Sequence, residues 1–236
     1  MSLEIKLIGS GGVNCYLLKS GDHYLLIDTG FSNHRTHLEE ELKRAGCLPG
    51  NLDQILVTHG DSDHVGNCAY LREKYGAKIA MHRNEVDAVK NGDPRLSRKI
   101  EYNLTGFMVR AILFFFILNK SDRFEPDLFI VDGYDLSEQG FNAQVLHLPG
   151  HSNGSLGVLT TEGDLFCGDL LGNFGKPAPG FGIFDTTGFE ASIEKLKKLN
   201  IKTVYPGHGK PFPWKQFANH SLKNKKRKTE QITFLF

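Results

Sequence analysis

Apolar positions fall into short runs that are separated by glycine-containing turns, a pattern typical of a chain that mixes strands with helices. Ser20-Gly21-Asp22 joins two such runs and predicts a β-hairpin. Strands are expected at 13–18, 23–28, 52–58, 78–82, 127–131, 144–148, 155–161, 164–168 and 203–205. Helices are expected at 36–45, 67–75 and 190–200, and Asn84 is expected to cap a further helix. Hairpins alternate with strand–helix–strand units, so the predicted fold class is mixed α/β.

Residues 107–118, with the sequence FMVRAILFFFIL, are apolar on almost every side of a helix. The run is too short to cross a bilayer, because a spanning helix needs about 20 apolar residues. A helix buried in the core is the first interpretation, and a lid over an apolar substrate, a homodimer contact and membrane docking are the alternatives. We therefore expect one domain over 1–236, with an apolar helical insertion or lid at 95–125.

Composition and charge exclude several classes of protein. The 236 residues are 40% hydrophobic and carry a net charge of +1, without the basic excess of a nucleic-acid-binding protein. A basic C-terminal tail at 221–236 is interpreted as a solvated segment. The N-terminus shows no secretory signal, which predicts a cytoplasmic protein. The four cysteines form no CxxC pair, so neither a zinc ribbon nor a disulfide frame is expected.

Candidate chemistry is concentrated in a loop that directly follows the strand predicted at 52–58. His59, Asp61, Asp63 and His64 lie within six residues of one another. Imidazoles and carboxylates at this density destabilise each other unless a cation compensates them. Three later fragments also place a ligand-type residue beside glycine after a strand: Pro149-Gly150-His151, Gly168-Asp169 and Pro206-Gly207-His208.

Together with Ile27-Asp28-Thr29-Gly30, these fragments resemble the metallo-β-lactamase superfamily. The THxHxDH-like loop, the GH(T/S)xGS loop, the GD strand end and the late GHG occur in the order of that family between Asp28 and Gly209. The resemblance implies a four-layer αβ/βα sandwich, in which two mixed sheets pack face to face with helices outside. It also implies a metal centre at one edge of the sandwich.

Carried over position by position, the resemblance implies two metal sites. His59, Asp61 and His151 would form the first site, and Asp63, His64 and His208 would form the second. Asp169 would bridge the two ions. Supporting contacts to these ligands are expected from Asp28, Thr58 and Ser155.

The chain departs from the family pattern at Asp61, where the family usually has histidine. An anionic oxygen donor lowers the Lewis acidity of the site and shifts its preference from zinc toward manganese or iron. Two divalent ions are expected, with zinc ahead of iron or manganese. The alternative is that Asp61 does not bind a metal and one site is weak or empty.

The function that the resemblance implies is metal-dependent hydrolysis of a small ester, thioester, lactone or related carbonyl substrate by a metal-bound hydroxide. Asp63 would orient the hydroxide and shuttle a proton to the leaving group. A glyoxalase II-type enzyme is disfavoured because about 27 residues follow Gly209, too few for the helical region of that class. Iron-dependent redox or oxygen chemistry, as in persulfide dioxygenases or diiron proteins, is the main alternative. A non-catalytic ligand-binding member of the fold is the second.

Overall fold

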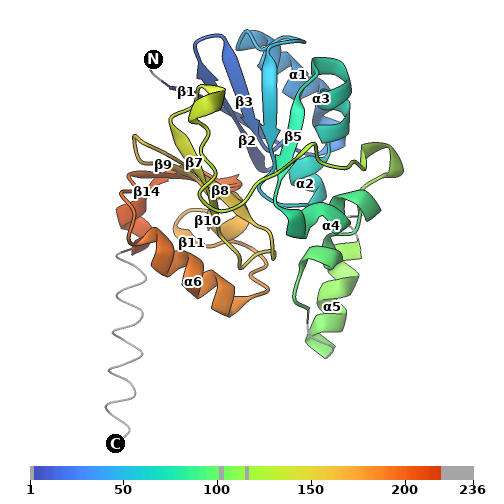
Figure 1. Cartoon of the computed structure of the whole chain (residues 1–236). Coiled ribbons are helices and arrows are strands. Elements are labelled where there is room, and N and C mark those ends of the chain that lie inside the picture. The colour runs from blue at the N-terminus through green and yellow to red at the C-terminus, as the bar shows by residue number, and fades with distance from the viewer. Residues whose placement is uncertain (1–2, 101–103, 115–116, 219–236) are drawn as a thin grey trace, which may run out of the picture.

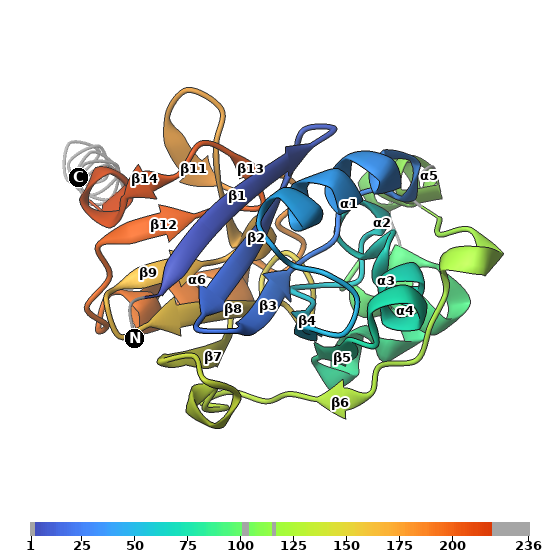
Figure 2. The same ribbon diagram turned by 90° about the horizontal axis from the view of Figure 1, so that it is seen from above.

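The structure is a computed structural model that describes residues 3–100, 104–114 and 117–218. Its strands form two large sheets and one small sheet, and helices cover the outer faces of the large sheets (Figure 1, Figure 2). The basic tail expected at 221–236 lies outside the described residues, so the interpretation of that segment stays a prediction.

The first large sheet has six strands that lie in the order of the sequence. Its first three strands pair antiparallel, and the hairpin predicted around Gly21 joins the second to the third. The other strands pair parallel, since each is reached through a crossover that contains helices. The strands are β1 (Glu4–Ser10), β2 (Val13–Ser20), β3 (His23–Ile27), β4 (Leu52–Leu56), β5 (Lys78–Met81) and β6 (Leu128–Phe129).

The second large sheet is also mixed, with strand order β14-β12-β9-β8-β7. These strands are β7 (Ala143–His147), β8 (Leu156–Thr160), β9 (Asp164–Phe166), β12 (Thr203–Tyr205) and β14 (Phe212–Pro213). A small third sheet, which the sequence pattern did not predict, joins β10 (Leu171–Asn173) to β11 (Pro177–Pro179) and β13 (His208–Gly209).

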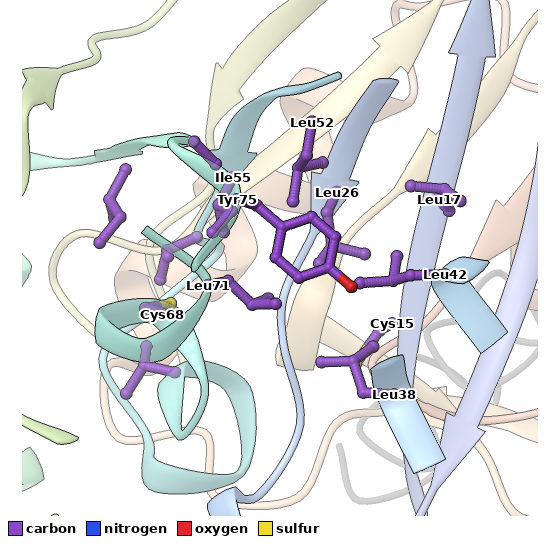
Figure 3. Packing of buried hydrophobic residues seen from close by; sticks show 14 of the residues in the cluster. Cys15, Leu17, Leu26, Leu38, Leu42, Leu52, Ile55, Cys68, Leu71 and Tyr75 are labelled. Carbon is purple, nitrogen blue, oxygen red and sulfur yellow. The ribbon is translucent and has the colours of Figure 1, made fainter. Parts of the chain in front are cut away.

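Three apolar clusters show how the layers pack. One lies between the two large sheets and includes Tyr16 of β2 and Phe166 of β9. The second packs the outer face of the first sheet against α1 (Arg35–Arg44) and α3 (Cys68–Tyr75). Figure 3 shows Tyr75 of α3 among leucines of that cluster. The third packs the second sheet against α6 (Thr186–Leu196). The layer order helix–sheet–sheet–helix confirms the predicted αβ/βα sandwich.

Two helix starts differ from the sequence-based expectation. Helix α6 begins at Thr186 rather than at 190, because the Asp185 carboxylate accepts a hydrogen bond from the Gly188 amide at 3.0 Å and caps the helix. The prediction that Asn84 caps a helix was wrong. Asn84 lies inside a 3₁₀ turn, and α4 (Val86–Asn91) begins after it.

The apolar segment at 107–118 forms a helix that is shorter and more exposed than expected. Helix α5 spans Leu104–Leu113 and projects from the body of the molecule next to α4 (Figure 1). The core interpretation was wrong for much of this helix, since Phe107 is 69% and Met108 59% exposed. Leu113 is buried and lines the cavity described below. None of the helices in the described part of the chain is long and apolar enough to cross a membrane.

Candidate metal centre

The ligand-type residues that follow β4 lie on one loop and the short helix after it. The chain leaves β4 at Leu56, and α2 (Ser62–Val65) begins six residues later. The backbone carbonyl of Asp61 accepts hydrogen bonds from the amides of His64 and Val65, which holds the first turn of α2. The four side chains of His59, Asp61, Asp63 and His64 are all buried.

The later residues reach the same edge of the sandwich from three other loops. His151 lies between β7 and β8, Asp169 lies in a 3₁₀ turn after β9, and His208 begins β13. The structure brings all seven predicted ligands together in three overlapping groups, and within each group the ligand atoms lie within 4.8 Å of one another. The groups are His59–Asp61–His151, His59–His64–Asp169 and Asp63–His64–His208.

Three atoms at this centre have the properties of metal ligands. Nε2 of His59, Nε2 of His64 and Oδ1 of Asp169 are buried without a hydrogen-bond partner among the described residues. A buried polar atom without a partner costs about 1–3 kcal/mol, and a cation bound by all three atoms would offset that cost. Gly207 permits this close approach, because a Cβ there would lie 2.3 Å from Asp169 Oδ1. The donor set of imidazole nitrogens and carboxylate oxygens therefore fits a divalent metal ion.

The buried charged groups at the centre shift the pKa values of their neighbours. Burial lowers the pKa of His64, but Asp63, Asp169 and Asp28 outweigh burial and raise that pKa well above its usual value. Burial also lowers the pKa of His208, but the neighbouring carboxylates outweigh burial and raise that pKa to about 10. A divalent cation would compensate the same carboxylates, and it would do so without protonating the imidazoles that face them.

Asp28 orients the imidazole of His64. Its Oδ2 accepts hydrogen bonds from His64 Nδ1 at 2.8 Å and from the Thr58 hydroxyl at 2.8 Å, and its Oδ1 accepts from the Thr58 amide. Since Nδ1 donates to Asp28, Nε2 is the atom that carries the lone pair in the neutral imidazole, which is the form that binds a metal. Asp28 has a left-handed backbone with φ of 59°, which Asn and Asp tolerate better than most residues.

The substitution Asp28→Asn is expected to weaken metal binding about 10- to 100-fold. The amide keeps the size of the side chain and tolerates the left-handed backbone, but it accepts a weaker hydrogen bond from His64. A competition titration with a chromophoric chelator measures the metal affinity, and the melting temperature checks the fold. An affinity equal to that of the unmodified chain would mean that Asp28 does not act through His64.

The contacts of Ser155 and the burial of Cys167 give both residues a structural role. The Ser155 hydroxyl accepts a hydrogen bond from the Ser152 amide at 3.1 Å and pairs with the Ser152 hydroxyl at 2.8 Å, within the loop that carries His151. Burial raises the pKa of the Cys167 thiol to about 12, so this group stays protonated at neutral pH.

Glu85 is a supporting residue that the sequence analysis missed. It is fully buried, and its carboxylate accepts from the Gly60 amide at 2.9 Å and from the Gly154 amide at 2.8 Å. These two amides belong to the loops that carry His59 and His151, so Glu85 joins the two loops. Nothing in the local sequence around Glu85 distinguishes it from a surface acid.

The substitution Glu85→Gln is expected to lower the free energy of unfolding by about 1–3 kcal/mol, because an amide has one acceptor oxygen and leaves one buried N–H group without its partner. Urea denaturation followed by circular dichroism measures the loss. Glu138→Gln is the matched control, since Glu138 is exposed. Equal stabilities of the two variants would contradict this role for Glu85.

Arg98 is the second residue that the sequence analysis missed. Its side chain is completely buried, and its Nη2 donates to the carboxylate of Asp61 and lies 2.9 Å from Nε2 of His151. Burial raises the pKa of Asp61, but the charges of Arg98 and His59 outweigh burial and hold that pKa well below its usual value. The Asp61 carboxylate is therefore ionised and paired with Arg98.

A cavity of about 330 Å³ opens beside these residues. One wall is polar and contains candidate ligands such as Asp63, Asp169 and His208. The other walls are mostly apolar and come from Val109, Leu113, Phe174, Phe181 and Phe184. This combination can hold a small molecule that has a reactive polar group and an apolar part.

Comparison with known proteins relates this geometry to a family. The family model described as metallo-beta-lactamase superfamily matches residues 8–208. Hydroxyacylglutathione hydrolase GloC of Haemophilus influenzae is 29% identical over 214 residues, which cover 89% of this chain and 91% of that protein. Beta-lactamase-like protein 2 homolog of Drosophila melanogaster is 28% identical over 204 residues. That match covers 84% of this chain, and the chain spans only 59% of the Drosophila protein.

Solved structures with a similar fold support the same family relationship. The crystal structure of TTHA1623 in a di-iron-bound form superposes on this chain with a TM-score of 0.66 and 27% identity, and the match covers 89% of this chain and 94% of that one. The family match extends over most of the chain and includes every candidate ligand from His59 to His208. The chain therefore belongs to the metallo-beta-lactamase superfamily.

Proposed function

We propose that this chain is a metal-dependent hydrolase of small esters or thioesters that carry an apolar acyl group. The observation that carries the proposal is the convergence of seven imidazole and carboxylate side chains on one end of a cavity whose other walls are largely apolar. The family includes hydrolases, and the Haemophilus relative carries the name of one.

The metal would be held by the candidate ligands that include the buried atoms without hydrogen-bond partners. His59, His64 and Asp169 supply these atoms, and Asp63 and His208 form a further group with His64. When bound, a divalent ion would supply Lewis acidity to a carbonyl oxygen and would make water a stronger acid. Zinc is the metal that we favour, with iron or manganese as alternatives.

Asp63 is the residue that we assign to proton transfer. Its carboxylate lines the cavity, and its Oδ2 lies 3.3 Å from Nε2 of His208. An ionised carboxylate at this position can take a proton from an attacking water and pass it to the leaving group, which is general base and then general acid catalysis.

The apolar walls select the acyl part of the substrate. Val109 and Leu113 come from α5, and Phe174, Phe181 and Phe184 approach from the loops after β9. A hydroxyacylglutathione is a thioester, so the name of the Haemophilus relative supports thioesters as candidates. This chain covers 91% of that relative, so a short segment after Gly209 does not exclude such an activity.

The test uses protein that is first stripped of metal with a chelator. The metal-free protein is then reloaded with zinc, manganese or iron. We expect the reloaded protein to hydrolyse p-nitrophenyl esters and acyl thioesters of glutathione, with higher kcat/KM for octanoyl than for acetyl groups. Metal-loaded protein that hydrolyses no member of this panel would contradict the proposal.

The substitution Leu113→Ala is expected to lower kcat/KM about tenfold for the octanoyl ester and to leave the acetyl ester nearly unchanged. Loss of contact with one or two methylene groups is worth about 1–2 kcal/mol, and the short acyl group does not make that contact. Met108→Ala is the control, because Met108 is on the same helix but is 59% exposed. An equal loss for both esters would place Leu113 outside the acyl pocket.

Iron-dependent redox chemistry is a second candidate, which the di-iron-bound form of TTHA1623 favours. Iron-loaded protein would then consume oxygen in the presence of a persulfide, whereas zinc-loaded protein would not. Hydrolysis by the zinc form without oxygen consumption by the iron form would reject this candidate.

A further inference from the structure

We infer that Arg98 is a resident cation of the centre, and that the chain consequently holds one metal ion rather than two. This inference rests on the proposed metal-dependent function. It concerns the group His59–Asp61–His151, where the family resemblance implies the first metal site.

The guanidinium group of Arg98 already uses the electron pairs that a first metal ion would need. Nδ1 of His151 lies 3.0 Å from the carbonyl oxygen of Phe181 and must donate to it, so the lone pair of His151 is on Nε2. Nη2 of Arg98 lies 2.9 Å from that Nε2 and also donates to both carboxylate oxygens of Asp61. Two of the three ligands in this group are therefore directed at Arg98.

Arg98 is held in place by contacts that do not involve Asp61 or His151. Its Nη1 donates to the carbonyl oxygen of Pro94 at 2.6 Å, and its guanidinium carbon lies 5.2 Å from the centre of the Phe184 ring. The preceding turn is tied to the His151 loop, because the Asn153 amide donates to the carbonyl oxygen of Ser97 at 2.8 Å. These contacts hold the Arg98 side chain at the centre independently of Asp61 and His151.

The unpartnered atoms identify where the single ion would bind. Nε2 of His59, Nε2 of His64 and Oδ1 of Asp169 lack partners among the described residues, and these three residues form one of the groups within 4.8 Å. All three atoms can therefore face one ion. Nε2 of His64 and Oδ1 of Asp169 lie 3.4 Å apart, as two ligands of one ion can.

The balance of charge agrees with one ion. Among the candidate ligands, Asp61 is paired with Arg98, which leaves the carboxylates of Asp63 and Asp169 to neutralise one divalent cation. Arg98 also lines the cavity, so it places a fixed positive charge where a carbonyl oxygen of a bound substrate becomes negative. In this arrangement the guanidinium replaces part of the charge of a first metal ion, but it does not replace its ability to bind water.

The experiment counts the metal ions that the 236-residue chain binds. Metal-free protein is titrated with Co²⁺ and followed by visible absorption, and metal content after gel filtration is measured by mass spectrometry. The unmodified chain is expected to bind one ion per chain, and Arg98→Met is expected to bind two. Arg98→Lys keeps the positive charge and is expected to bind one. The double variant Arg98→Met/His151→Ala should return to one, because the vacated group then lacks a ligand.

Two bound ions in the unmodified chain, or one ion in folded Arg98→Met, would overturn the inference. If Arg98→Met does not fold, the count for the unmodified chain and for Arg98→Lys decides, since two ions in either contradicts a resident guanidinium. The count is independent of hydrolysis. A chain that binds one ion and hydrolyses nothing would contradict the proposed function alone, whereas an active chain with two ions would contradict only the role of Arg98.

Discussion

Asp169→Ala is expected to remove the bound metal and to lower kcat/KM by about a thousandfold or more. Oδ1 of Asp169 faces His64 at 3.4 Å and Oδ2 faces His208 at 3.3 Å, so this carboxylate contacts two other candidate ligands at once. Burial raises the pKa of Asp169, but His64 and His208 outweigh burial and hold that pKa well below its usual value. Loss of metal catalysis is worth several kcal/mol, and about 4 kcal/mol corresponds to a thousandfold.

Metal content by mass spectrometry and kcat/KM for the best substrate of the panel measure this effect. Asp22→Ala is the control for loss of a carboxylate, since Asp22 is exposed in the turn between β2 and β3. The melting temperature of the metal-free protein separates loss of the site from loss of the fold. An Asp169→Ala variant that keeps its metal and more than a tenth of its activity would show that the centre does not depend on this carboxylate.

Phe166→Ala is expected to lower the free energy of unfolding by about 3–5 kcal/mol, the usual range for a fully buried phenylalanine. Phe166 is 0% exposed between the two large sheets. Its ring lies 5.1 Å from that of Tyr16 in an edge-on arrangement and 4.8 Å from that of Tyr205 in a stacked arrangement. Removing the ring leaves a cavity between layers that are each supported from outside by helices, so the sheets cannot easily close it.

Urea denaturation of the purified variants measures this loss. Phe107→Ala is the matched control, because Phe107 is 69% exposed on α5 and should change the free energy of unfolding by less than about 0.5 kcal/mol. A loss below about 1 kcal/mol for Phe166→Ala would mean that the sheets repack around the vacated space. Phe166 packs against Tyr16, whose hydroxyl donates to the Pro206 carbonyl at 2.7 Å. Phe166→Ala should therefore also weaken metal binding near His208.

Most of the fold follows from local patterns. Continuous apolar runs with a turn between them predicted β2 and β3, and Gly46 and Gly76, both with positive φ, marked the ends of α1 and α3. The strand β1 (Glu4–Ser10) was missed, and so were β10, β11, β13 and β14, which are two or three residues long. Strands this short show no period of their own, and they exist because a partner strand is present.

The apolar sequence of helix α5 did not predict which faces of the helix are buried. The segment was expected to be covered on more than one side, yet Leu104 is 78% and Phe107 69% exposed. Hydrophobicity measures the gain from burial, but which faces are buried depends on what the rest of the chain places against them. In the described residues, α5 contributes Val109 and Leu113 to the cavity and leaves much of its remaining surface open.

The sequence by itself determined which side chains could serve as metal ligands. Histidine and aspartate beside glycine at strand ends resemble the motifs of the superfamily, and that resemblance supplied the seven candidates. Only the tertiary structure decided what surrounds them. Arg98 is 37 residues from Asp61 and 53 from His151, and Glu85 joins the loops that contain Gly60 and Gly154. Such contacts leave no local pattern, because the free energy of burying a charge depends on distant groups that meet it after folding.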